Sequence, residues 1–109
     1  MSVIQNFEAM LARGQDSALL RYGLGNAYLN QADPTSAILH LAEAVRLDPG
    51  YSAAWKLYGK ALAAAGDHAA AVAALGQGIA TAVAKGDVQA AREMQVFLKR
   101  AQKALDGPP

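Results

Sequence analysis

The chain has 109 residues and no cysteine, so it is long enough for one domain and excludes disulfides, thiolate metal ligands and a cysteine nucleophile. Hydrophobic residues make up 53% of the sequence, but alanine is the commonest of them, which favours helices that pack closely around a thin core. Ten basic and nine acidic residues leave a net charge of +1, without the basic excess expected of a protein that grips a phosphate backbone.

Apolar side chains recur at helical spacing in six segments, which we predict as helices over residues 3–13, 18–31, 34–47, 52–65, 68–85 and 88–105. Residues with turn and capping chemistry separate these segments. Gly14 can end the first helix, and either Asp16 or Ser17 can cap the second. Asp33 can cap the third helix, and Pro34 suits its first turn.

The second half of the chain follows the same scheme. Ser52 is expected to cap the fourth helix and Asp67 the fifth. The last helix should bury one apolar stripe, made of Ala91, Met94, Leu98, Ala101 and Leu105. We expect its opposite face, which carries Arg92, Lys99, Arg100 and Lys103, to be solvated. Gly107, followed by two prolines, should stop the helix.

An internal repeat relates the middle of the chain to itself. Gly25 and Gly59 are 34 residues apart in the sequence, and so are Leu41 and Leu75. Further pairs keep this interval: Ala27 with Ala61, Asp33 with Asp67, Ala37 with Ala71, Ile38 with Val72 and Val45 with Ile79. This period predicts a helical hairpin repeated along one axis, in which small residues let the two helices of a hairpin approach closely.

The ends of the chain fit the period only in part. Phe7 lies one period before Leu41, so the first helix is predicted to be the second half of a truncated repeat. The last helix enters the frame only if two residues are inserted. We therefore predict that it is a cap with a polar outer face, which helical stacks need for solubility.

The segment from Ala18 to Lys85 resembles the tetratricopeptide repeat, a helical hairpin whose period of about 34 residues equals the interval between these pairs. The first copy fills the family pattern with Leu24-Gly25, Tyr28, Ala37, Leu41, Ala44 and Pro49, and the second with Trp55, Gly59, Leu62, Ala71 and Leu75. Four positions depart from the pattern. In the first copy, Arg21 replaces an aromatic residue. In the second copy, Tyr58 replaces Leu, Gly78 replaces Ala and Val83 replaces the proline.

This resemblance implies an all-α fold, a right-handed superhelical stack of antiparallel helical hairpins, or α-solenoid. One domain would cover residues 1–109, with a half-repeat helix over 3–13, repeats over 18–51 and 52–85, and a capping helix over 88–105.

The resemblance also implies a binding site, because the first helix of each tetratricopeptide hairpin lines a concave groove for a peptide or a partner's helix. By position in the repeat, the groove-lining residues would be Leu19, Tyr22, Asn26, Leu29, Asn30, Lys56 and Lys60. Two alternatives remain open. These residues could form only a solvated helix face, or Asn26 and Lys60 could clamp a carboxylate, although Tyr22 stands where that clamp has a lysine.

Catalytic and metal-binding patterns are not found. His40 and His68 have no second imidazole nearby in sequence, and no nucleophile elbow, zinc-protease helix or phosphate loop occurs. We therefore expect a non-enzymatic protein without a cofactor. No apolar run reaches the ~20 residues needed to span a bilayer. The N-terminal segment also lacks the positive charge that precedes the apolar residues of a secretory signal peptide. We therefore expect a cytoplasmic protein that has no membrane partner.

Two functions of different classes follow from the sequence. The first is an adaptor or co-chaperone-like scaffold that binds another protein or peptide in the groove. The second is a structural unit that associates weakly with itself through its incomplete repeat ends.

Overall fold

Six helices make up all the secondary structure in residues 2–107, which are the residues that the computed structural model describes. They are α1 (Val3–Ala12), α2 (Ala18–Asn30), α3 (Pro34–Leu47), α4 (Ser52–Ala64), α5 (His68–Ala84) and α6 (Val88–Asp106). Each observed end lies within one residue of its predicted position. Met1, Pro108 and Pro109, which the predicted domain includes, lie outside the described residues.

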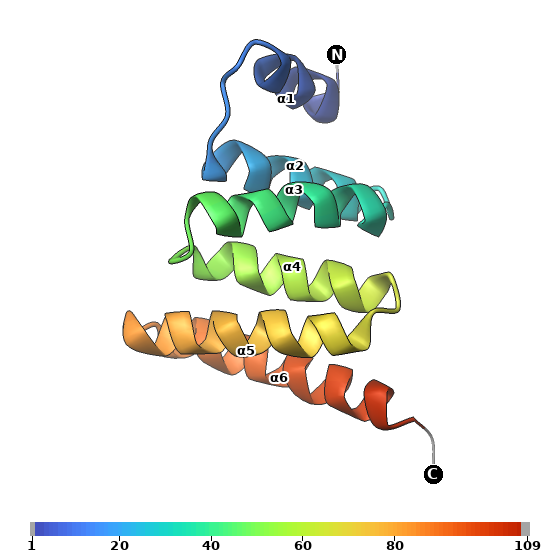
Figure 1. Cartoon of the computed structure of the whole chain (residues 1–109), viewed down its shortest axis with the longest axis vertical. Helices are drawn as coiled ribbons and strands as arrows, with labels where there is room; N and C mark the ends of the chain where they lie inside the picture. The colour runs from blue at the N-terminus through green and yellow to red at the C-terminus, as the bar shows by residue number, and fades with distance from the viewer. Residues whose placement is uncertain (1, 108–109) are drawn as a thin grey trace.

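Successive helices run antiparallel and stack along the longest axis of the molecule, which measures 48 × 32 × 18 Å (Figure 1). Helices α2 and α3 form one hairpin, and α4 and α5 form the next. Helix α1 lies at one end of the stack and α6 at the other (Figure 1). The predicted all-α fold of stacked helical hairpins is confirmed.

Side-chain caps begin most of the helices. The side chains of Ser17, Asp33 and Asp67 accept hydrogen bonds from backbone amides in the first turns of α2, α3 and α5. The expectation for Ser52 is wrong, because Ser52 is already the first helical residue of α4 and Tyr51 is the N-cap, without a side-chain cap. The ring of Tyr51 instead stacks on Tyr22, with centroids 5.0 Å apart.

The two repeats share the same close approach inside each hairpin. A Cβ atom on Gly25 would lie 2.4 Å from Leu41 Cγ, and a Cβ atom on Gly59 would lie 2.4 Å from Leu75 Cγ. Both leucines are fully buried or nearly so. Only glycine leaves room for the leucine of the partner helix, which confirms the predicted role of these two glycines.

Gly78, a departure from the repeat pattern, has a similar explanation. A Cβ atom there would lie 2.5 Å from Met94 Sδ and 2.7 Å from Trp55 Cβ. Ala44 occupies the same position in the first repeat. The second repeat therefore needs glycine because α6 inserts a large methionine over α5.

Helix α6 packs on α5 through Met94 and Ala101, which are 0% and 2% exposed. Leu105 was expected to belong to the same buried stripe, but it is 54% exposed. Ala101 packs beside Ala71, near the start of α5. Leu105 lies one turn later, in the last turn of α6, and does not belong to any of the core clusters.

The turn between the two repeats is held from two directions. Trp55 Nε1 donates a hydrogen bond of 2.8 Å to the carbonyl oxygen of Pro49, and Lys85 Nζ donates one to the carbonyl oxygen of Gly50. Lys85 follows the last residue of α5, which extends to Ala84 because Val83 replaces the expected proline. The end of the second hairpin therefore contacts the start of that hairpin.

Candidate binding groove

The predicted groove residues on α2 fall into two groups. Asn26 and Asn30 are exposed, and Leu19 is 71% exposed. Tyr22 and Leu29 are half-buried and pack against the core residues between the two hairpins. The first group is available to a ligand, whereas Tyr22 and Leu29 also hold the stack together.

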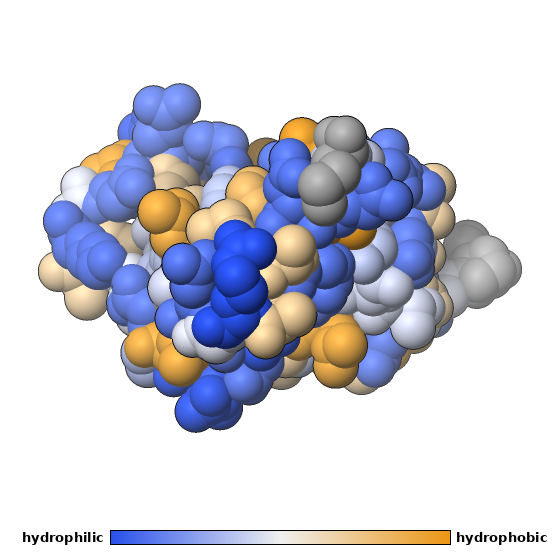
Figure 2. Space-filling model, turned by 90° about the horizontal axis from the view of Figure 1, so that it is seen from above, coloured by the Kyte–Doolittle hydropathy of each residue, from blue (hydrophilic) through white to orange (hydrophobic). Residues whose placement is uncertain are grey.

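The α1–α2 cleft is a hollow of about 570 Å³ between the first two helices. Asn26 and Asn30 line it from α2, opposite Val3, Ile4 and Phe7 of α1. Phe7 also fits against Gly23, where a Cβ atom would lie 2.9 Å from the phenyl ring. The cleft combines an apolar wall with three amide side chains, those of Asn26, Asn30 and Gln31. Seen from this end of the molecule, hydrophobic residues lie scattered among hydrophilic ones (Figure 2).

The two predicted lysines lie on α4 and face α6. Lys56 Nζ is 3.0 Å from Glu93 Oε2, beside a hollow of about 310 Å³ between the first turns of the two helices. Lys60 Nζ lies 5.2 Å from the centroid of the Phe97 ring. Lys56 is therefore neutralised by a carboxylate of this chain, whereas Lys60 contacts an aromatic ring.

Arg100 is a further residue of this region that sequence reasoning did not select. Its Cζ lies 5.6 Å from the Phe97 centroid, so two cations contact one ring, as cation–π pairs do. Phe97 and Arg100 were missed because the last helix is out of register with the repeat, so position in the repeat gave no groove residues there. The expectation that Arg100 belongs only to a solvated face is incomplete.

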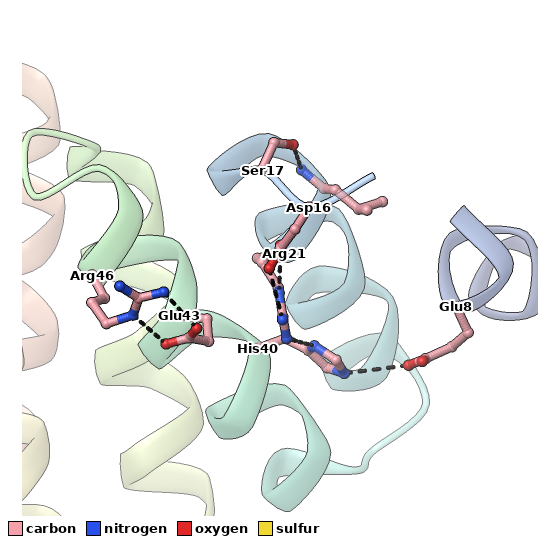
Figure 3. Close-up of polar contacts among 8 residues, drawn as sticks. Glu8, Asp16, Ser17, Arg21, His40, Glu43 and Arg46 are labelled. Atoms are coloured by element: carbon pink, nitrogen blue, oxygen red, sulfur yellow. Dashed lines mark hydrogen bonds and ion pairs between the residues drawn. The ribbon is translucent and has the colours of Figure 1, made fainter. Parts of the chain in front are cut away.

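A polar network joins α1 to the first hairpin (Figure 3). Tyr28 donates a hydrogen bond of 3.0 Å to Glu8 Oε1, and His40 Nε2 lies 3.3 Å from the same oxygen. The imidazole stacks on the Tyr28 ring at 5.6 Å, and its Nδ1 lies 3.1 Å from Arg21 Nη1. Arg21 also donates two hydrogen bonds to the Asp16 carboxylate, at 2.8 and 3.0 Å.

Burial and the neighbouring charges shift the pKa values in this network. The hydrogen bonds from Arg21 lower the pKa of the Asp16 carboxyl. Burial lowers the pKa of His40 from its ordinary 6.5, although Glu8 opposes the shift. Because a guanidinium can only donate, Nδ1 must accept from Arg21, so the proton of the neutral ring is on Nε2, facing Glu8. The network therefore fits a neutral His40.

Within residues 2–107, no group of three or more His, Asp or Glu side chains is placed to hold a metal ion. No helix in that part of the chain is both long enough and apolar enough to cross a bilayer.

Comparison with known proteins places this stack of hairpins in a family. The tetratricopeptide repeat model matches residues 4–52 and 22–87, and the first match begins within α1. The chain belongs to the tetratricopeptide repeat family, whose repeats generally mediate contacts between proteins.

Two relatives resemble the chain over nearly its whole length. A TPR repeat-containing protein of Pseudomonas aeruginosa is 53% identical over 102 residues, which are 94% of this chain and 97% of the relative. The solution structure of a Bordetella parapertussis protein is 43% identical and superimposes with a TM-score of 0.80, covering 94% of this chain and 89% of that one.

Proposed function

We propose that the chain is an adaptor or co-chaperone-like scaffold that binds a peptide or helix of a partner protein along α2, α4 and α6. The observation that carries the proposal is that hollows lie beside these helices, one between α1 and α2 and two between α4 and α6, and that Asn26, Asn30, Lys56 and Lys60 line them. Amide and ammonium groups beside apolar walls suit a peptide, which offers backbone carbonyls and mixed side chains. Without cysteine, the chain also suits a reducing cytoplasm.

Affinity capture from the native cell extract, followed by mass spectrometry, tests the proposal. The variant to compare is Asn26→Ala with Lys60→Ala, since both side chains are exposed. Tyr22 is unsuitable, because it stacks on Tyr51 and its loss would weaken the hairpin contact. We expect the double variant to fold normally and to lose captured partners.

The control is Thr35→Ala with Gln77→Ala, which removes two exposed polar side chains from α3 and α5. This control should retain the partners. Partners retained equally by both double variants would show that binding occurs elsewhere.

A second candidate function is self-association through the half-repeat at the N-terminus. It is favoured by the α1–α2 cleft and by α1 itself, which has no fully buried residue. Sedimentation across a range of concentrations tests it. A second copy that docks there would give a concentration-dependent mass, and a constant monomer mass would remove this candidate.

A further inference from the structure

The α4–α6 pocket is a cavity of about 250 Å³ further along the seam that contains Lys56 and Glu93. Lys60 and Arg100 line it, together with the Phe97 ring. Its remaining walls are Gly59, Ala63 and Ala101, the Leu75 side chain and His68. This volume is below the roughly 300 Å³ at which pockets for whole small molecules begin. It suits one large side chain of a longer ligand.

The charges along the α4–α6 seam are unequal. Lys56 and Lys60 are one turn apart on α4, and Glu93 and Phe97 are one turn apart on α6. Glu93 neutralises Lys56 at 3.0 Å. One turn later Phe97 takes the place of the carboxylate, and Arg100 adds a second cation. Neither Lys60 nor Arg100 forms an ion pair with any residue in the described range 2–107.

His68 adds a polar requirement to the same pocket. Its Nδ1 is buried and has no hydrogen-bond partner among the residues that the structure describes. Buried polar atoms in folded proteins nearly always have a partner, so an unpaired one calls for an explanation. The backbone of a bound peptide, and not its apolar side chain, would supply that partner.

The geometry points to a peptide that presents a large apolar side chain beside an acidic one as the ligand of the α4–α6 pocket. The apolar side chain enters beside the Phe97 ring, where Ala63 and Ala101 present only small side chains. The neighbouring carboxylate lies at the rim, between Lys60 and Arg100. This inference rests on the proposed groove function and names the chemistry that part of the groove recognises.

The carboxylate is assigned to a side chain and not to a chain end. Glu93 shows that a side-chain carboxylate fits between α4 and α6 one turn away. A peptide passing through the groove can place an aspartate or glutamate at the equivalent position. The Phe97 ring lies beside both cations and leaves their charges available to a planar carboxylate, because an aromatic ring attracts a cation without neutralising it.

Selection from a library of random twelve-residue peptides tests the inference. The peptides are displayed between flexible flanks, so that none has a free carboxyl end. We expect enriched peptides to share an acidic residue next to Leu, Met or Phe. Lys60→Gln and Arg100→Gln should each weaken an enriched peptide about fivefold, the range of an exposed ion pair. Lys99→Gln removes the same charge from α6 outside the pocket and should change nothing.

The outcomes separate the two proposals. If no peptide is enriched, groove binding itself fails, and the inference fails with it. If the enriched peptides lack the acidic–apolar pair, or bind Lys60→Gln and Arg100→Gln normally, the inference is overturned while groove binding stands. Enrichment only in a second library with free carboxyl ends would overturn the side-chain assignment. Displacement of the enriched peptide by a twelve-nucleotide RNA would point to a phosphate ligand instead.

Discussion

The two ends of the helical stack are closed by different physical means. Helix α1 has no fully buried residue and is joined to the first hairpin by the network of Glu8, Tyr28 and His40. Helix α6 instead buries Met94 completely against α5 and Trp55. Apolar burial in water is worth more than an exposed polar contact, so we expect the α6 end to be the stable one and the α1 end to open locally.

The largest change in the free energy of unfolding is expected when a methionine is shortened to alanine, and this change should differ between the two ends of the stack. Met94→Ala should lower the free energy of unfolding by about 3 kcal/mol, because a fully buried side chain leaves a cavity. Met10→Ala on α1 should cost clearly less, because Met10 is only half-buried. Urea denaturation of both variants provides the measurement. Equal losses would contradict the difference between the ends.

A smaller effect is expected when the polar network is cut. Glu8→Ala removes the acceptor of Tyr28 and should cost about 1 kcal/mol, since the carboxylate is partly exposed. Its signature is local: amide hydrogens of α1 should exchange faster while those of α5 stay protected. Glu43→Ala is the control, because that carboxylate forms its ion pair with Arg46 within α3. Unchanged exchange in α1 after Glu8→Ala would show that apolar contacts alone hold this helix.

Acid should also weaken the contact between α1 and the first hairpin, because His40 in the polar network becomes protonated. The pKa of His40 is lowered in the folded state, so between that value and the unfolded value near 6.5 the unfolded chain binds more protons. The stabilisation is therefore complete above pH 6.5 and decreases as the pH falls below it. Protonated Nδ1 would also face the Arg21 guanidinium. We expect a lower urea midpoint at pH 5.5 than at pH 7.5, with a smaller difference in His40→Gln.

The smallest effect is expected at the α4–α6 seam. Lys56→Gln breaks the ion pair with Glu93, but both side chains are partly exposed, so the loss should be within about 1 kcal/mol. High salt should reduce the difference between this variant and the original chain. A larger loss would mean that polar contacts also contribute substantially to holding α6.

Much of the fold could be predicted because the same pattern of residues occurs in both repeats. The pairs Gly25 with Gly59 and Leu41 with Leu75 have the same spacing, and each glycine makes the same contact with its leucine. The polar network could not be found in this way. Ala74 stands at the position of His40 in the second repeat, so the repeat carries no second copy of the histidine. Arg21 was the visible signal, since it departs from the family pattern, but nothing in the sequence identified its partners.

The candidate site was predictable only where the repeat frame holds. It located Asn26, Asn30, Lys56 and Lys60 on helices that flank hollows. It could not show that Lys56 is neutralised, since Glu93 lies 37 residues away on the helix that is out of frame. Phe97 and Arg100 were missed for the same reason. Side-chain partners across a seam depend on the rotation of each helix, which composition and periodicity do not determine.

The held turn between the repeats has a consequence for the response of the molecule to mechanical force. Trp55 and Lys85 both donate to carbonyl oxygens of the turn that links α3 to α4. When force is applied to the two ends of the chain, these hydrogen bonds would resist the separation of the two repeats. Helix α1 contacts the first hairpin through the side chains of Glu8, Tyr28 and His40. The solenoid should lengthen in stages: α1 peels away first, and the paired hairpins extend together at higher force.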